Sequence, residues 1–409
     1  MSSLEITLPP LAKGLTRRPP RAARLALALL GDMTGGSLAV SLPNGDRIRV
    51  GEGPDAGALR VAEWSLFDRV LAAGDIGLGE SWMAGGWECD DLAAVLTLLA
   101  RNRPVLRRAV YGRALSLLGY RLRHLLRANS REGSARNIMA HYDLGNDFYR
   151  LWLDDSMTYS AGLFDGPTDT LEAAQRRKYQ RLLAQVGAAP GDTILELGCG
   201  WGGFAEVAAR EVGCKVLGIT LSPAQLRYAR ERAAAEAWAD RATFALCDYR
   251  DVAGQYDHIV SVEMIEAVGE AYWPTYFRQI AARLRPGGRC AIQAITIDDV
   301  LFPRYRRGTD FIRRYVFPGG MLPSRGAIAR EASRAGLQIE DDFGFGADYA
   351  RTLAEWHQRF LARQDAVRAL GFPERFLRLW RFYLAYCEAG FRAGDIDVRH
   401  VVLAHGTRG

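Results

Sequence analysis

Short apolar runs alternate with longer segments of helical periodicity through the second half of the chain. The apolar runs predict strands over 194–197, 216–220, 242–247, 256–262 and 290–297. Apolar residues recur at helical spacing over 171–186, 204–212, 223–235 and 271–284. A strand near 338–345, helices from 349 to about 391 and a last strand over 398–405 complete the pattern. Strands that alternate with helices in this way predict an α/β fold with a doubly wound parallel sheet.

The first part of the chain has shorter elements of both kinds. Residues 1 to about 20 carry paired prolines among basic residues and are expected to be loosely ordered. The elements predicted next are an apolar segment over 25–30, a hairpin over 37–50, a helix over 62–73, a loop rich in Gly and Trp over 77–87, and a helix over 91–99. The tryptophans of this loop either belong to a core or cover a greasy ligand. We predict a small α+β accessory domain over 1–130 and a second domain over 131–409.

A run of arginines lies next to the predicted domain boundary. From Arg101 to Arg136 there are ten arginines and one acid, and leucines form an apolar stripe as far as residue 127. A cationic amphipathic helix is typical of docking on an anionic membrane surface. The alternative is a solvated arginine face that packs on a neighbouring domain. Nucleic acid is not expected as a partner, because no recognised binding module accompanies the charge.

Composition sets broader bounds. With 409 residues and 49% hydrophobic content, the chain has material for two or three domains, and its net charge is +6. The six cysteines have no C-x-x-C spacing, so we expect reduced thiols and no metal site. The apolar run near the start is too short to span a membrane, and no signal-peptide cleavage pattern is present. These features favour the cytoplasm.

The stretch from Glu196 to Gly203 joins the first strand of the predicted sheet to the next helix. Gly198 and Gly200 allow a tight turn that brings bare backbone against a ligand, and the helix beyond offers free N–H groups. Ligands bind outside the carboxyl ends of parallel strands, so Gly198, Thr220, Asp248 and residues 263–266 should border one cleft. Thr220 and Gln225 follow the second strand, where no acid is present to bind a ribose. Asp248 and Tyr249 are suited to hold an adenine edge.

The acid and glycines of LELGCGWG resemble motif I of the class I S-adenosylmethionine (SAM) methyltransferases. The chain as a whole resembles the cyclopropane-fatty-acyl-phospholipid synthase family, which includes mycolic acid cyclopropane synthases and fatty-acyl C-methyltransferases. The resemblance runs from about residue 136 to the end. It is carried by HYDLGND (141–147), Tyr159-Ser160, LELGCGWG (195–202), TLSPAQ (220–225), VEMIEAVG (262–269), YVFPGGMLP (315–323), FGADY (345–349) and FRAGDI (391–396).

The resemblance implies transfer of a methyl group from SAM to the cis double bond of an unsaturated phospholipid acyl chain. It implies a class I SAM methyltransferase sheet with a helical insertion. The cofactor-binding residues that follow from it are Tyr159, Ser160, Glu196, Gly198, Gly200, Trp201, Gly202, Thr220, Leu221, Gln225, Asp248 and Tyr249. The carbocation formed by such a transfer needs aromatic shelter, for which Tyr159, Trp201, Tyr349 and Tyr383 are candidates.

A proton must then leave the cation. In the family a bicarbonate ion takes it, and the matching positions here are Glu266, Ile295, Tyr349 and Cys387. The chain departs from the family pattern in three places: Gln293 and Ala267 stand where a histidine is common, and Ala161 where a cysteine is. Gln293 can donate a hydrogen bond to bicarbonate but cannot titrate, so the base site is expected to be retained in altered form.

The resemblance leaves several alternatives open. Loss of the proton from the added methyl closes a cyclopropane ring, whereas loss from a neighbouring carbon gives a methylene or methyl-branched chain. We expect an enzyme peripheral to the inner face of the membrane, and leave open a homodimer and a reductase or desaturase partner. The alternative functions are a small-molecule amine N-methyltransferase and a SAM-binding partner of another lipid enzyme without turnover.

Overall fold

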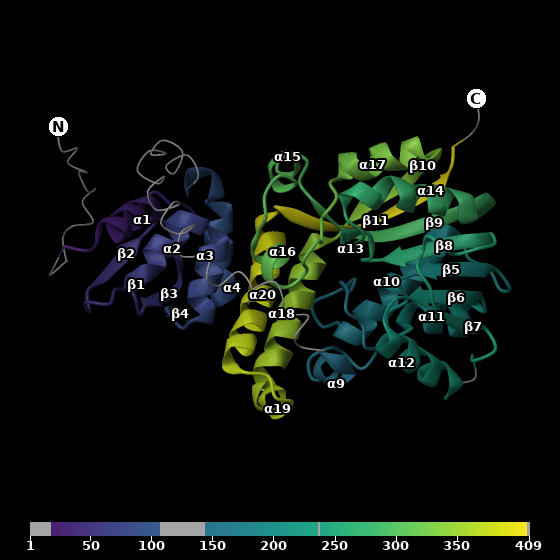
Figure 1. Cartoon of the computed structure of the whole chain (residues 1–409), viewed down its shortest axis with the longest axis horizontal. Helices are drawn as coiled ribbons and strands as arrows, with labels where there is room; N and C mark the ends of the chain where they lie inside the picture. Colours follow the sequence, from purple (N-terminus) through teal and green to yellow (C-terminus); the bar gives the residue numbers. More distant parts are fainter. Residues whose placement is uncertain (1–17, 107–143, 236–237, 407–409) are drawn as a thin grey trace. The chain divides into compact units, whose positions relative to one another are not determined.

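The computed structural model describes residues 18–106, 144–235 and 238–406. The chain divides into two compact units (Figure 1). The first comprises Met1–Tyr142, Asp310–Val316 and Val367–Ala393, and the second comprises Asp143–Thr309, Phe317–Ala366 and Gly394–Gly409. The arginine-rich segment beyond residue 106, His141 and the predicted boundary near residue 130 lie outside the described residues.

The first unit is built on a small mixed sheet with the strand order β2-β1-β3-β4. Its strands are β1 (Ser37–Ser41), β2 (Arg47–Val50), β3 (Asp55–Val61) and β4 (Trp87–Cys89). The predicted hairpin over 37–50 is confirmed, because β1 pairs antiparallel with β2. Its helices are α1 (Arg21–Gly31), α2 (Ser65–Ala73), α3 (Asp75–Met83) and α4 (Leu92–Arg101), with α16 (Phe311–Tyr315) and α20 (Glu374–Ala393) from the later chain.

The prediction of a loop over 77–87 is wrong, because most of these residues belong to helix α3. Two glycines favoured the loop, but close packing explains them: a Cβ on Gly77 would lie 2.1 Å from the Arg69 carbonyl oxygen, and one on Gly79 would lie 2.3 Å from the Phe311 ring. Trp82 and Trp87 are fully buried, and their indole N–H groups donate to backbone carbonyls at 2.9 and 3.0 Å. These two tryptophans therefore belong to the core of the unit.

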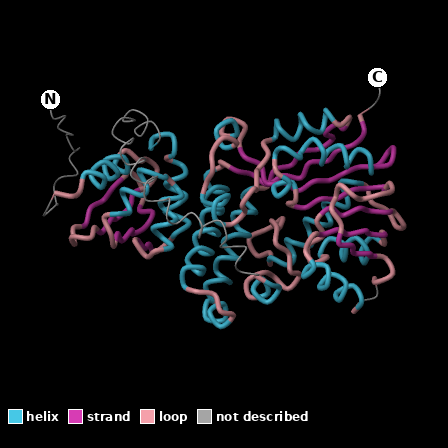
Figure 2. Tube along the Cα trace, in the orientation of Figure 1, coloured by secondary structure: helices cyan, strands magenta, loops and turns pink. Residues whose placement is uncertain are grey.

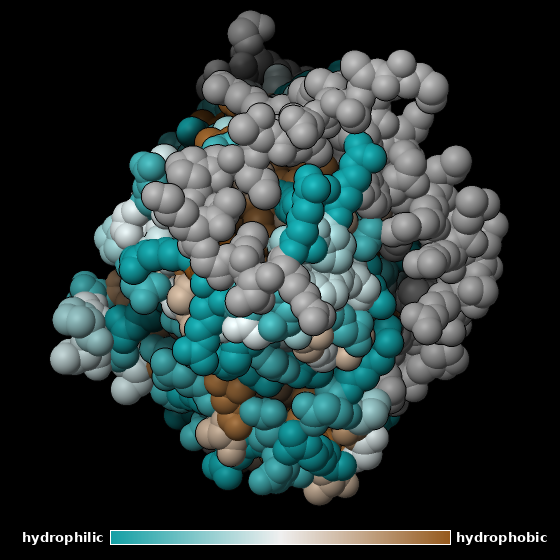
Figure 3. All heavy atoms as spheres, turned by 90° about the vertical axis from the view of Figure 1, so that its left-hand side faces the viewer, coloured by the Kyte–Doolittle hydropathy of each residue, from teal (hydrophilic) through white to brown (hydrophobic). Residues whose placement is uncertain are grey.

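No helix within the described residues combines the length and hydropathy needed to cross a bilayer. On the face that Figure 3 shows, the residues drawn in colour are mostly hydrophilic, and hydrophobic ones form small separate patches.

The second unit holds a seven-stranded sheet with the order β10-β11-β9-β8-β5-β6-β7. Its strands are β5 (Thr193–Leu197), β6 (Lys215–Thr220), β7 (Ala242–Leu246), β8 (Tyr256–Val262), β9 (Leu284–Ile297), β10 (Leu337–Gly344) and β11 (Ile396–His405). β5 to β9 run parallel, as predicted, whereas β11 pairs antiparallel with both β9 and β10. The sheet is therefore mixed at one edge.

Helices cover both faces of this sheet (Figure 2). They are α9 (Gly145–Arg150), α10 (Leu171–Val186), α11 (Gly203–Val207), η2 (Ala208–Val212), α12 (Pro223–Ala234), α13 (Ile265–Val268), η3 (Glu270–Tyr272), α14 (Trp273–Arg283), α15 (Phe302–Tyr305), α17 (Arg325–Arg334) and α18 (Gly346–Ala362). α19 (Gln364–Ala369) spans the division between the units.

Strand residues of alternating parity build two cores, one on each face of the sheet. Ile194 and Val216 pack with α10, α11 and α12, whereas Leu195 and Ile259 pack with α14 and α17. Alternate side chains of a strand point to opposite faces, so neighbouring apolar residues such as Ile259 and Val260 of β8 are needed where both faces are covered. This burial fixes the strand register and places the carboxyl ends of β5, β6, β7 and β8 along one edge.

Candidate active site

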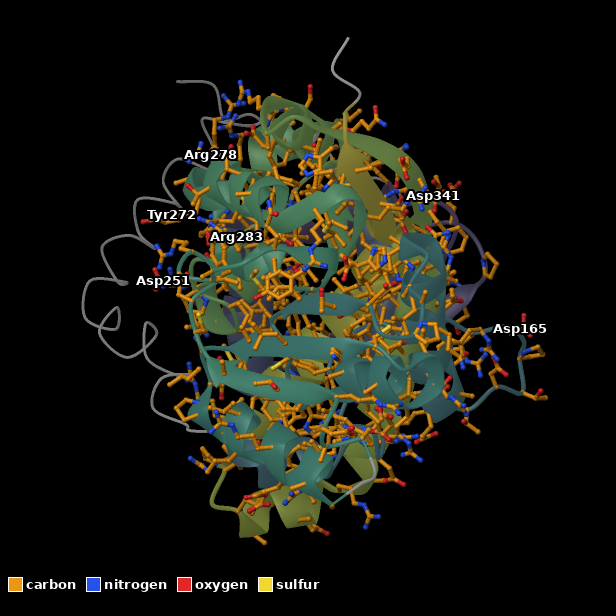
Figure 4. All side chains as sticks on the ribbon, turned by 90° about the vertical axis from the view of Figure 1, so that its right-hand side faces the viewer. Asp165, Asp251, Tyr272, Arg278, Arg283 and Asp341 are labelled. Atoms are coloured by element: carbon orange, nitrogen blue, oxygen red, sulfur yellow. The ribbon has the colours of Figure 1, made fainter. Side chains whose placement is uncertain are left out.

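A cavity of about 790 Å³ lies at the carboxyl ends of these parallel strands. It brings together all of the predicted cofactor-binding residues except Gly202, namely Tyr159, Ser160, Glu196, Gly198, Gly200, Trp201, Thr220, Leu221, Gln225, Asp248 and Tyr249. Tyr272 also borders it, and Figure 4 shows Tyr272 and Asp251 along one side of the second unit, away from Asp341. The cleft expected from the strand order is thus present.

The glycine loop after β5 owes its path to residues with positive φ. Gly198 and Gly200 have φ angles of 79° and 51°, in the left-handed region that favours glycine. The backbone N–H groups of Gly198 and Cys199 donate to the Ile219 carbonyl at 3.1 and 2.9 Å, which ties the loop to β6. Gly202 also has a positive φ, 84°, and a Cβ there would lie 3.2 Å from Phe244. Its place in the motif is therefore explained by backbone conformation together with packing.

Glu196 is the acid that precedes this loop. Its side chain is 2% exposed, and its Oε2 is buried without a hydrogen-bond partner among the described residues. Removal from water raises the pKa of Glu196 well above its usual value, although the charge of Arg232 opposes the shift. A buried polar atom without a partner is costly, so this carboxylate is suited to receive a cationic group of a ligand. The ammonium group of SAM has that chemistry.

The segment after β6 combines helix capping with a polar edge of the cavity. Ser222 accepts from the Gln225 N–H at 3.3 Å and caps α12, while the Thr220 hydroxyl donates to Gln225 Oε1 at 2.9 Å. Leu221 is 70% exposed, an unusual state for a leucine beside a cavity. At the end of β7, Arg250 binds both oxygens of Asp248 at 2.8 and 2.6 Å and lowers the pKa of that carboxyl.

Aromatic side chains gather on one side of the cavity. Tyr159 lies with its ring centroid 5.4 Å from those of Tyr149, Trp152 and Trp356, and Trp201 lies 5.1 Å from Tyr149. The Trp201 indole N–H donates to Asn146 Oδ1 at 2.8 Å, which fixes the ring. Tyr159 and Trp201 both line the cavity, and their part in sheltering a cation stays a prediction. Tyr383, a further candidate, is on α20 in the first unit.

Glu263 follows β8, also lines the cavity and accepts three hydrogen bonds. Its Oε1 accepts from the Ala161 N–H at 2.9 Å and from Gln293 Nε2 at 2.8 Å, and its Oε2 accepts from the Tyr349 hydroxyl at 2.6 Å. Glu263 has a φ angle of 49°, one of two positive values among the described non-glycine residues. Removal from water raises the pKa of Glu263, and Lys178 and the three donors oppose that shift.

A chain of hydrogen bonds supports this carboxylate from behind. Gln293 Oε1 lies 2.8 Å from His400 Nε2, and His400 Nδ1 lies 3.0 Å from Arg181 Nη1. Since Arg181 can only donate, Nδ1 accepts and Nε2–H donates to Gln293. Burial, Arg181 and Lys178 hold the pKa of His400 well below its usual value, so the ring is neutral. The amide of Gln293 is thereby oriented with its NH₂ group toward Glu263.

Glu266 and Lys178 are two further ionisable groups whose charges act on Glu263 or are acted on by it. Glu266 Oε1 accepts from the Ile295 N–H at 2.5 Å, whereas its Oε2 is buried without a hydrogen-bond partner among the described residues. Burial and the charge of Glu263 raise the pKa of Glu266 to about 8. Lys178 is fully buried and donates to the Ser160 hydroxyl, and burial lowers its pKa to about 7 despite Glu263.

Sequence reasoning placed Glu263 at the border of the cleft without a chemical role, and it singled out neither Lys178 nor His400. Lys178 stands four residues from both Ala174 and Leu182, on the buried face of α10, and His400 stands between Val398 and Val402 on an inward face of β11. A polar residue at an apolar position of a periodic pattern was the available signal. Cys387, predicted as catalytic, lies on α20 in the first unit, so its part in the site stays a prediction.

The family model for mycolic acid cyclopropane synthetase matches residues 129–401. The chain belongs to this family. It is 44% identical over 343 residues to tuberculostearic acid methyltransferase UfaA1 of Mycobacterium tuberculosis, which covers 82% of this chain and 80% of that protein. It is 36% identical over 354 residues to the cyclopropane-fatty-acyl-phospholipid synthase of Escherichia coli, which covers 85% and 88% respectively.

A solved family structure confirms the fold. Mycolic acid cyclopropane synthase CmaA1, solved in complex with SAH and CTAB, is 30% identical and superposes with a TM-score of 0.61 over 66% of this chain and 98% of that one. The second unit therefore has the class I SAM methyltransferase fold.

Bicarbonate, which the family implies as the base, does not fit the donors found here. Of the groups predicted to bind it, the Tyr349 hydroxyl and Gln293 Nε2 both donate to Glu263, and the Ile295 N–H donates to Glu266. Two carboxylates of the chain itself hold these donors. All three donors thus already have acceptors in this structure, and the binding of bicarbonate by Tyr349, Gln293 and Ile295 stays a prediction.

Proposed function

We propose that this protein transfers a methyl group from SAM to the cis double bond of an unsaturated phospholipid acyl chain. The observation that carries the proposal is the Glu196 oxygen beside the glycine loop, which is buried and has no hydrogen-bond partner within the described part of the chain. It lies at the carboxyl ends of the parallel strands in a chain that belongs to the family. SAM supplies an electrophilic methyl group on a sulfonium. Glu196 would bind its ammonium group, and Asp248 and Tyr249 would hold its adenosyl part.

The acceptor end of the cavity suits an alkene. An alkene is a weak nucleophile, so its reaction depends on being held against the methyl group in a site without water. Tyr159 and Trp201 would lie beside the positive charge that develops on the acyl chain. Relatives named for cyclopropane and for methyl-branched products leave two outcomes for this chain, ring closure and a methylene or methyl branch. A saturated branch requires a reductase partner.

The acyl chains of membrane phospholipids are the inferred substrate, so the enzyme would work peripherally at the cytoplasmic face of the membrane. The arginine-rich segment from residue 101 to residue 136 would supply attraction to anionic headgroups. Replacing several of its arginines by glutamate should reduce binding to anionic liposomes at low salt. Unchanged binding would remove this part of the proposal.

The decisive experiment is incubation of the protein with SAM and a monounsaturated phospholipid, followed by mass spectrometry of the released fatty acids. Ring closure or methylene formation adds the mass of one CH₂ group, and a saturated branch adds two further hydrogens. No change in acyl mass, with methyl transfer to an amine acceptor instead, would favour an amine N-methyltransferase. SAM binding without transfer to either acceptor would favour a non-catalytic partner.

A further inference from the structure

The placement of Glu263 is difficult to explain by stability alone. Its left-handed backbone costs an L-residue with a Cβ roughly 1 kcal/mol or more, which a glycine at the same place would avoid. Its carboxyl group also loses water on burial. Strain of this kind persists where the surroundings over-determine it, and here three donors from separate segments converge on the two oxygens.

The three donors define a site shaped for a planar anion. Two of them, Tyr349 and Gln293, are residues to which the family resemblance assigns the binding of a bicarbonate base. Glu263 fills that position with a carboxylate of similar shape and the same negative charge, and it also lines the cavity. The chain thus carries its own anion where the family uses a free one.

We propose that Glu263 is the general base of the reaction and that the enzyme works without bicarbonate. This inference rests on the proposed function, since it names the group that takes the proton from the methylated acyl cation. Lys178 supplies positive charge that favours the ionised form of Glu263, and the donation by Tyr349, Gln293 and the Ala161 N–H holds the carboxylate in place.

The step balances with the groups named. The π pair of the alkene forms a C–C bond to the methyl carbon, the S–CH₃ bond breaks with its pair left on sulfur, and a carbocation remains on the neighbouring carbon. Glu263 then accepts a proton, and the released C–H pair forms either the third side of the ring or a new C=C bond. Glu263 becomes a neutral acid, and its proton passes to solvent when the product leaves. No oxidant or reductant is consumed.

Glu266 is less suited to this role. It is not among the residues that line the cavity, and one of its oxygens accepts from the backbone of β9. Two carboxyl groups in mutual repulsion do not both ionise readily, and the pKa of about 8 favours a protonated Glu266 near neutral pH. A neutral Glu266 leaves the negative charge on Glu263.

The test compares Glu263→Gln with Glu263→Gly in full-length protein. Glutamine keeps the size of the side chain but cannot take the proton, so turnover should fall by roughly 100-fold or more while S-adenosylhomocysteine binding is unchanged. Glycine relieves the left-handed backbone and opens an anion-sized space before the same three donors. Added bicarbonate or formate should restore part of the activity of Glu263→Gly and none of that of Glu263→Gln. Glu355→Gln, on the helix that carries Tyr349, is the matched control for charge.

Two further measurements keep the outcomes separate. Wild-type turnover should not change when carbon dioxide and bicarbonate are removed, and ¹³C-bicarbonate should bind to Glu263→Gly but not to wild type. Bicarbonate-dependent wild-type turnover, bicarbonate binding by wild type, or full activity of Glu263→Gln would each overturn the inference. If wild type methylates no lipid, the proposed function fails instead, and the binding measurement still decides whether Glu263 occupies the anion position.

Discussion

Two carboxylates that line the cavity differ in how the protein satisfies them. Glu196, before the glycine loop, is buried with an oxygen that has no hydrogen-bond partner among the described residues, whereas Glu263, after β8, accepts three hydrogen bonds. An unsatisfied buried acid gains most from a ligand that brings the missing charge. A fully satisfied acid is held in one position before any ligand arrives. The contrast separates a binding group from a reacting group.

The contrast predicts the largest effect on affinity at Glu196. Glu196→Ala removes the partner proposed for the ammonium group, and a hydrogen bond to a charged group contributes about 1.5–3 kcal/mol. S-adenosylhomocysteine affinity, measured by isothermal titration calorimetry, should therefore weaken by roughly 10- to 100-fold.

Stability is the control for that variant. Because one oxygen of Glu196 is buried without a hydrogen-bond partner in the described ranges, removal of the side chain should leave the melting temperature of the ligand-free protein unchanged or raised. Glu211→Ala, an exposed acid beyond the same loop, should change neither quantity appreciably. A lowered melting temperature of Glu196→Ala with normal S-adenosylhomocysteine affinity would show that Glu196 has a structural role and no binding role.

The opposite pattern is predicted behind Glu263. Gln293→Leu leaves both Glu263 Oε1 and His400 Nε2 short of a partner, and each unsatisfied buried group costs about 1–3 kcal/mol. Chemical denaturation should show a lower free energy of unfolding, together with reduced turnover and unchanged S-adenosylhomocysteine affinity. Gln358→Leu, an exposed position on α18, supplies the control. Weakened cofactor binding in Gln293→Leu would mean that the Glu263 site and the Glu196 site are not independent.

The glycine-loop site is easier to predict from sequence than the Glu263 site, for a physical reason. The glycine loop is a local signal, since its acid, its turn and the following helix are contiguous in the chain. The Glu263 site joins segments that are distant in sequence, at Ala161, Gln293, Tyr349 and His400, and only the folded sheet brings them together. The motif VEMIEAVG contains Glu263, but no spacing within it reveals the three donors.

The fold shows the same division. The apolar residues of β8 allowed this strand to be predicted with its bounds, and α10 was predicted with its bounds from its periodicity. Helix α3 was missed because one of its glycines, Gly79, is required by close packing against Phe311, which is far along the chain. The assignment of α16 and α20 to the first unit likewise depends on long-range packing that no local pattern encodes.

A milder change at the reacting end tests how much the Tyr349 donor contributes. Tyr349→Phe removes the hydroxyl that donates to Glu263 at 2.6 Å and keeps the ring. A single hydrogen bond to a charged acceptor contributes about 1.5–3 kcal/mol, and the two remaining donors still hold the carboxylate, so turnover should fall by roughly tenfold. Steady-state kinetics should show the loss in kcat with little change in KM for SAM. An equal loss in Tyr349→Phe and in Glu263→Gln would make the tyrosine a reacting group itself.

The smallest predicted effect is a pH dependence of S-adenosylhomocysteine affinity that arises from Glu196. Burial raises the pKa of Glu196 in the free protein, so a protonated fraction is present in mild acid, and binding of a cationic ammonium group requires its ionised form. Binding then releases a proton, and affinity for S-adenosylhomocysteine should rise with pH as long as the α-amino group of the ligand stays protonated. Calorimetry in two buffers of different ionisation enthalpy measures the released proton directly. Glu196→Gln should bind S-adenosylhomocysteine weakly and without this pH dependence, whereas Glu263→Gln should keep the pH dependence. Loss of the pH dependence in Glu263→Gln instead would indicate that the ammonium group binds beside Glu263 and not beside Glu196.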